Sequence, residues 1–139
     1  MLLKLPLILM IILTKKKLKS IVHYLGKEGY RTGIAGKLHV SPQQVFPFEM
    51  VDGLERNCVS ENADFDLEKL RHFISKDKSE PFCMVSALVV PHIPWTVGDP
   101  SHFNPDEFKL PEYLADTKET RKEFANYLAE IEVLDYQVG

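Results

Sequence analysis

Cysteine is scarce in this sequence. Cys58 and Cys83 are the only two among 139 residues, and they do not form a C-x-x-C pair. Structural zinc sites use closely spaced cysteines, so this spacing argues against one. A single disulfide between the two is compatible with the sequence. Cys83, however, lies in an apolar run, and we expect it to be a small buried residue instead.

An excess of positive charge is also missing. The formal net charge is −3 at pH 7. Nucleic-acid binding usually requires a basic face, so we expect no nucleic-acid partner. Hydrophobic residues make up 45% and charged residues 27% of the chain, which is ordinary for a globular protein. With 139 residues, the chain is expected to contribute to one domain at most.

No apolar run is long enough to cross a bilayer. Residues 1–13 are strongly apolar, although Lys4 and Pro6 interrupt them, and three lysines follow at 15–17. A spanning helix needs about 20 residues, so we expect no stable transmembrane anchor. The run resembles the core of a signal peptide, but lysines stand where a small-residue cleavage site belongs. Residues 1–19 are therefore an uncleaved signal-like anchor, a core helix or an incorrectly assigned start, and the last two are favoured.

A short strand is predicted over residues 30–35, after a helix over 20–28 that begins at Ser20 and ends at Gly29. Directly after this strand come Lys37 and His39, two residues apart. In an extended chain both side chains project to the same side, where an ammonium group and an imidazole can bind an anion. The alternative is a surface lysine beside a partly buried histidine.

A second strand is predicted over residues 81–90, which are apolar on both faces. This pattern is typical of a central strand in a parallel sheet that helices cover on both faces. The stretch 30–35 is the only other strand candidate that the sequence offers. Because two strands do not make a doubly covered sheet, we expect the chain to be part of a larger α/β domain.

The second strand leads into Pro91-His92-Ile93-Pro94. Ligands of open α/β sheets bind beyond the carboxyl ends of the strands, so His92 is a candidate site residue. The alternative is a rigid turn with an incidental histidine. Two aromatic residues further along, Trp95 and Phe103, either line a sugar site or cover the sheet.

Two more helices are expected, one ending near Ser75 and capped by Asp64 or Asp66, and one over residues 117–138. A long loop over 97–115 joins the second strand to the last helix. Acidic residues at helix starts and in loops are interpreted as caps and solvated surface instead of metal ligands: Asp64, Asp66, Asp106 and Glu107.

Three segments together resemble the sulfatase family. They are GYRTGIAGKLHV, VVPHIPW and YLAEIEVLDYQVG, and they occur in the family's order. The resemblance covers residues 20–139 and implies the middle part of a catalytic domain with an alkaline-phosphatase-like α/β fold. KLHVSPQQVFPFE is most similar to the subgroup of N-sulfoglucosamine sulfohydrolases, also called heparan N-sulfatases. The implied activity is hydrolysis of a sulfuric ester or sulfamate, on a sulfated carbohydrate.

The resemblance also implies roles for the candidate residues. Lys37, His39 and His92 fall on family positions that bind the sulfate, and the two histidines are the catalytic ones. Lys37 would neutralise sulfate oxygens, and His39 would position the nucleophile or relay its proton. His92 would donate to a sulfate oxygen or protonate the leaving group, work that suits a group titrating near neutrality.

The departures from the family are equally specific. Family members use a formylglycine nucleophile made from a C-x-P-S-R or S-x-P-S-R motif, and calcium held by acidic residues and an asparagine. This sequence contains neither the motif nor the paired acidic residues that open the first strand of the family's fold. We therefore expect an incomplete chain that is inactive alone, from a protein that is secreted, periplasmic or lysosomal as its relatives are. The alternative is a non-catalytic remnant that binds a sulfated sugar or a partner.

Overall fold

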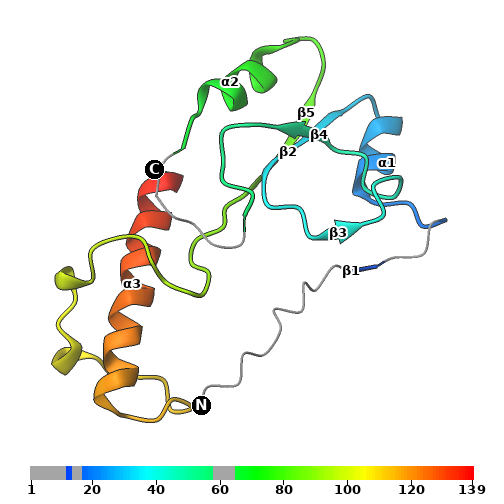
Figure 1. The fold of residues 1–139 in the computed structure, drawn as a ribbon. Helices are drawn as coiled ribbons and strands as arrows, with labels where there is room; N and C mark the ends of the chain where they lie inside the picture. Colours follow the sequence, from blue (N-terminus) through cyan, green and yellow to red (C-terminus); the bar gives the residue numbers. More distant parts are fainter. Residues whose placement is uncertain (1–11, 14–16, 58–64) are drawn as a thin grey trace.

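The computed structural model describes residues 12–13, 17–57 and 65–139. Cys58 and Asp64 lie outside this part, so the possible disulfide and one of the two predicted helix caps are not addressed. Most of residues 1–16 also lie outside it. Figure 1 shows the described part as a small sheet with two short helices, and a long helix to one side.

The sheet contains three parallel strands in the order β4-β2-β5. They are β2 (Arg31–Gly36), β4 (Glu49–Val51) and β5 (Phe82–Ala87). All six residues of β2 are buried, and since successive side chains point to opposite faces, both faces of β2 are covered. The predicted α/β class with a parallel sheet flanked by helices is confirmed.

Two helices cover the sheet. Helix α1 (Ile21–Lys27) packs against β2, and it ends before Gly29, which has a φ of 79°, as predicted. Helix α2 (Glu68–Ser75) contributes Leu70 and Phe73 to a core with Ala35 and Val51. The N-cap position of α2 is Leu67, which has no side-chain cap, so the prediction of Asp66 at that position is wrong. Asp66 lies one residue earlier, and its Oδ1 accepts from the backbone N–H of Glu68 at 2.8 Å.

One strand was missed. The sequence offered only residues 30–35 and 81–90 as strands, and β4 was overlooked because its three residues are too few to show a period of two. Strand β5 was expected at the centre of a larger sheet, and within the described residues it lies at an edge beside β2. Phe82 is consequently 40% and Val85 36% exposed, and Cys83 is only partly buried. A further strand beside β5 would be needed to bury this apolar pattern.

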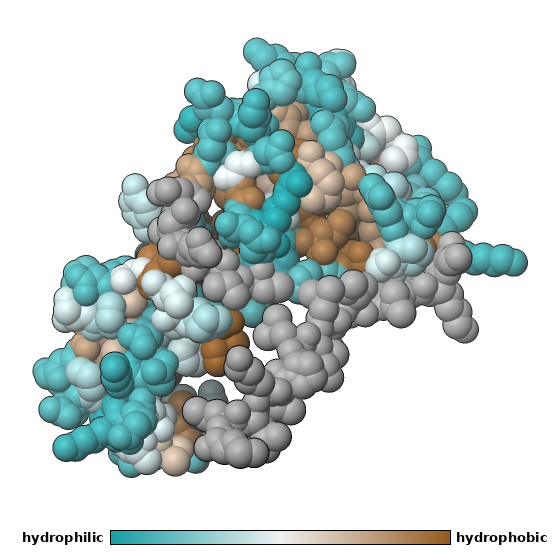
Figure 2. Space-filling view, in the orientation of Figure 1, coloured by the Kyte–Doolittle hydropathy of each residue, from teal (hydrophilic) through white to brown (hydrophobic). Residues whose placement is uncertain are grey.

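The apolar surface left by this arrangement is visible. Figure 2 shows hydrophobic side chains on the part of the molecule that holds the sheet, within a largely hydrophilic surface. A two-residue strand, β1 (Ile12–Leu13), pairs in parallel with β3 (Val40–Ser41) outside the three-stranded sheet. Among the described residues, no helix is both long and apolar enough to cross a membrane.

The long helix α3 (Lys118–Val138) confirms the last predicted helix. It begins after Thr117, whose side chain accepts from the N–H of Thr120. The preceding loop contains two short 3-10 helices, η1 (Pro100–His102) and η2 (Pro105–Glu107), and both contact α3. In Figure 1, α3 lies beside the sheet instead of on it, and it faces the loop that leaves β5.

Candidate functional site

The first part of the site is the Lys37 loop (residues 37–39), which follows β2. Gly36 has a φ of 88°, and an added Cβ there would lie 2.1 Å from the carbonyl oxygen of Ala87. Only glycine fits this approach. The N–H of Lys37 then donates to the same carbonyl oxygen at 2.9 Å. The loop therefore begins where β2 and β5 end side by side.

The structure brings the three candidate residues together. The pKa of His39 is lowered from its ordinary value by burial first, then by the charge of Lys37 and then by His92. Both groups must lie close to the imidazole to act on it. Lys37, His39 and His92 are all partly buried, and they meet at the carboxyl ends of β2 and β5. This is the sheet edge at which ligands of α/β proteins bind.

This cluster favours an anion. Lys37 and a protonated histidine repel each other, and an anion between them would remove the repulsion and raise the pKa of His39 again. A cation would be repelled by the charge of Lys37. Within the described part of the chain, no group of three His, Cys, Asp or Glu side chains could hold a metal ion.

The second part is the His92 loop (residues 91–97), which follows β5. The Nδ1 of His92 lies 2.7 Å from the carbonyl oxygen of Ile93. A carbonyl oxygen can only accept, so we assign the hydrogen to Nδ1. In the neutral ring Nε2 is then the basic nitrogen, and it can exchange a proton with a ligand. The peptide bonds before Pro91 and Pro94 are cis.

A residue that the sequence analysis did not identify holds this loop. Glu130 of α3 is 1% exposed, and its carboxylate accepts backbone hydrogen bonds from the loop. Its Oε2 accepts from the N–H of His92 at 3.0 Å. Its Oε1 accepts from the N–H of Thr96 at 2.8 Å and of Val97 at 3.4 Å. A buried carboxylate needs such partners, because burying it without them would be costly.

The sequence does contain a signal for Glu130. It lies three residues after Tyr127 and four before Leu134, so in the predicted last helix it shares a face with these two large, mostly apolar side chains. A carboxylate at that spacing on an apolar face has to find buried donors. What the sequence cannot show is that a loop more than thirty residues earlier supplies them.

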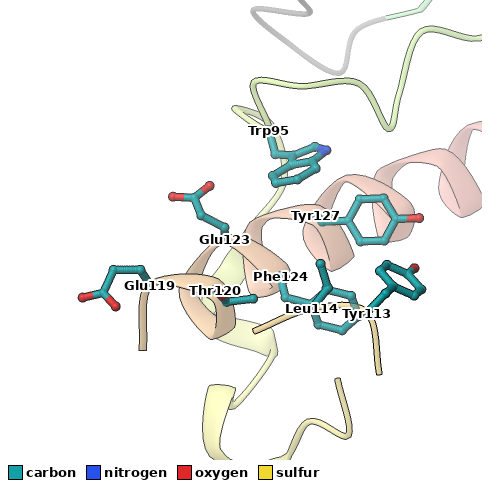
Figure 3. Close-up of a pocket in the computed structure, with 8 residues that line it drawn as sticks. All are labelled: Trp95, Tyr113, Leu114, Glu119, Thr120, Glu123, Phe124 and Tyr127. Carbon is teal, nitrogen blue, oxygen red and sulfur yellow. The ribbon is translucent and has the colours of Figure 1, made fainter. Parts of the chain in front are cut away.

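A pocket of about 540 Å³ lies beside the His92 loop. We call it the aromatic pocket, and Figure 3 shows the residues that line it: Trp95, Tyr113, Leu114, Glu119, Thr120, Glu123, Phe124 and Tyr127. The ring of Trp95 meets that of Tyr127 edge to face, with 5.5 Å between centroids. Trp95 thus packs on α3 and not on the sheet. Phe103 lines a different hollow, between the loop and α3.

The remaining polar candidates are structural. Asp106 and Glu107 form part of the exposed η2, and Asn104 interacts with both. His23 lies in the first turn of α1, where its Nδ1 accepts from the N–H of Ser20 at 3.3 Å. None of these is among the groups that perturb His39.

Part of the chain is similar to part of a known protein. No family model matches the chain. Human N-sulphoglucosamine sulphohydrolase is 34% identical over 79 residues, which cover 55% of this chain and 16% of that protein. The chain thus matches a small part of the relative's length. This similarity supports a sulfatase-like relationship, in agreement with the resemblance of the three segments.

Proposed function

We propose that this chain is part of a sulfatase-like hydrolase that acts on a sulfuric ester or sulfamate of a sulfated carbohydrate. The observation that carries the proposal is the position of Lys37, His39 and His92 just past the paired ends of β2 and β5, where the charges of Lys37 and His92 act on His39. These are also the residues that the family resemblance assigns to sulfate binding. The partial similarity to a human sulphohydrolase supports the same reaction class.

In this proposal Lys37 supplies a permanent positive charge for the sulfate oxygens. At an effective dielectric constant of about 20, two unit charges 4 Å apart attract each other by about 4 kcal/mol. The surroundings of His39 lower its pKa, which favours the neutral imidazole that can accept a proton from a nucleophile. His92 offers Nε2 for a sulfate oxygen or the leaving group, since its Nδ1 is engaged by Ile93.

The cofactors of the family do not fit the described residues. Calcium prefers oxygen ligands, whereas the cluster consists of an ammonium group and two imidazoles. No C-x-P-S-R or S-x-P-S-R motif is present in the sequence, and Cys83 lies in β5 within PFCMVSA. We therefore derive no step through calcium or formylglycine. Export to a lysosomal, periplasmic or extracellular location belongs to the proposal for the whole protein.

The aromatic pocket adds a place for the sugar. Trp95 belongs to the same loop as His92, so a sulfated sugar bound at His92 can reach the rings of Trp95 and Tyr127. We expect Trp95→Ala to weaken binding of N-sulfoglucosamine without affecting inorganic sulfate. Equal weakening of both ligands would show that Trp95 only supports the loop.

The central test is sulfate binding by the full chain. Calorimetry with inorganic sulfate should show binding that Lys37→Ala, His39→Asn and His92→Asn each weaken. Lys27→Ala, which removes an exposed charge from α1, is the matched control and should have no effect. No binding by the wild-type chain, or equal losses in the control, would contradict the proposal.

A second test separates the hydrolase from a non-catalytic binding module. The coding DNA on both sides of the codons for Ser20 and Gly139 should be sequenced. A C-x-P-S-R or S-x-P-S-R motif before, and an Asp-Asn or Asp-His pair after, would favour the hydrolase. Sulfate binding without either would favour a binding module. The purified chain itself should not hydrolyse an aryl sulfate or a sulfamate, and turnover above background would overturn that expectation.

A further inference from the structure

The most deeply buried carboxylate in the described residues lies outside the sheet, on α3. Glu130 is 1% exposed, and its carboxylate accepts hydrogen bonds from three backbone N–H groups of the His92 loop. An ion pair is not what it provides, because the contacts are to neutral donors. It instead fixes the loop at both ends, at His92 and at Thr96 and Val97.

The contact between the loop and α3 is close as well as polar. Gly98 follows the loop with a φ of 86°, and an added Cβ would lie 2.5 Å from the carbonyl oxygen of Ala129. Ala129 is fully buried next to Glu130. The loop is thus held against α3 at His92 and again from Thr96 to Gly98, which leaves little freedom for the residues between these two points.

One of the residues between the two anchored ends is Ile93, whose carbonyl oxygen accepts from Nδ1 of His92. This bond is local to the loop, so it forms only when the loop has the observed path. A carboxylate that fixes the path therefore also fixes which ring nitrogen of His92 carries hydrogen. Outer partners commonly set the tautomer and orientation of a functional histidine in this way.

We infer that Glu130 is a positioning residue for His92: its carboxylate holds the His92 loop so that Nδ1 is engaged by Ile93 and Nε2 faces the ligand. The inference rests on the proposed function for the part that concerns sulfate. Its structural part stands independently, because the tautomer of His92 can be measured with no ligand present.

The test uses the full chain and Glu130→Gln, which keeps the shape of the side chain. One of its two oxygens becomes an NH₂ group, which cannot accept a hydrogen bond from the loop. Long-range proton–nitrogen NMR of the histidine rings, assigned with His92→Asn, reports the tautomer. We expect His92 to be in the Nδ1–H form in the wild-type chain and to lose that preference in E130Q. Sulfate affinity should fall about tenfold, the effect of losing one charge-assisted hydrogen bond.

The matched control is Asp135→Asn, which removes an exposed carboxylate from the same helix outside the aromatic pocket and should change neither readout. An unchanged His92 tautomer in folded E130Q would overturn the inference. If the wild-type chain binds no sulfate, the proposed function fails. The tautomer of His92 in the wild-type chain and in E130Q still tests the positioning role of Glu130.

If E130Q does not fold, Glu130→Asp replaces it, since the shorter side chain cannot reach both ends of the loop. Amide hydrogen exchange of the wild-type chain gives an answer that needs no variant. The N–H groups of His92 and Thr96 should be protected, and rapid exchange of both would overturn the inference.

Discussion

The two loops of the site are built in different ways. The Lys37 loop continues directly from two paired strands, and its first N–H is bonded to the end of β5. The His92 loop is fixed by a helix that begins more than twenty residues later in the chain. One half of the site therefore depends on strand pairing within the sheet, and the other half depends on the docking of α3. Substitutions can test the strand pairing and the docking of α3 separately.

The largest expected effect is on the His92 loop, from Glu130→Ala. This change leaves one buried and two partly buried N–H groups without their acceptor, so we expect a loss of about 3 kcal/mol in the free energy of unfolding. Urea denaturation measures the loss. Glu123→Ala on the exposed face of α3 should stay within about 0.5 kcal/mol of the wild type. Equal losses of stability in the two variants would show that the contact between Glu130 and the His92 loop is not important for stability.

The next effect is on the Lys37 loop, from Gly36→Ala. A Cβ at 2.1 Å from the carbonyl of Ala87 and a positive φ should together cost about 3 kcal/mol and separate the ends of β2 and β5. Gly29→Ala is the control, because its φ is also positive but nothing lies within 4 Å of the added atom. It should cost about 1 kcal/mol by denaturation. Similar losses for both would show that the strand contact is loose.

A smaller and purely electrostatic effect is expected from Lys37→Ala. It removes the charge that, after burial, contributes most to lowering the pKa of His39, so that pKa should rise toward 6.5. NMR titration of the His39 ring measures the change. With the pKa lowered, the wild-type fold is destabilised as the pH falls below 6.5, and the variant should lose less stability there. In the wild type, sulfate should bind more tightly as His39 becomes protonated.

The smallest effect is expected away from both loops, at His102. Its pKa is raised by a hydrogen bond and the charge of Glu132, and then by the charge of Asp99. The stabilisation is complete below pH 6.5 and is lost as the pH rises through the raised value. His102→Asn should thus lower the thermal midpoint slightly at pH 6 and not at pH 9. A difference that persists at pH 9 would indicate a packing role.

Much of the Lys37 loop was predictable, because the signals for the helix and the strand that precede it are local. Ser20, Gly29 and the apolar run after it placed a helix and a strand correctly. That strand also located Lys37 and His39 at a ligand-binding edge, where the structure places them near His92. The chemical roles of the three residues stay predictions.

The His92 loop was predictable only in part, because the helix contact that fixes it is not part of the pattern of its own segment. The sequence placed His92 after an apolar strand, but it did not indicate that Glu130 would accept from its N–H. Strand β4 is too short to give a pattern, and this omission hid the fact that β2 is central. The apolar character of β5 was read correctly, whereas its edge position depends on neighbours that the described residues do not include.

Strand β5 has a consequence for handling the protein. Its backbone groups bond to β2 on one side only within the described part of the chain, and apolar side chains such as Phe82 and Val85 accompany the open edge. An unpaired edge is a template for a strand from another molecule. Two copies can satisfy each other's hydrogen bonds there, so the oligomeric state of the purified chain should depend on its concentration. Dilution, more than buffer composition, will then determine whether a solution holds single chains.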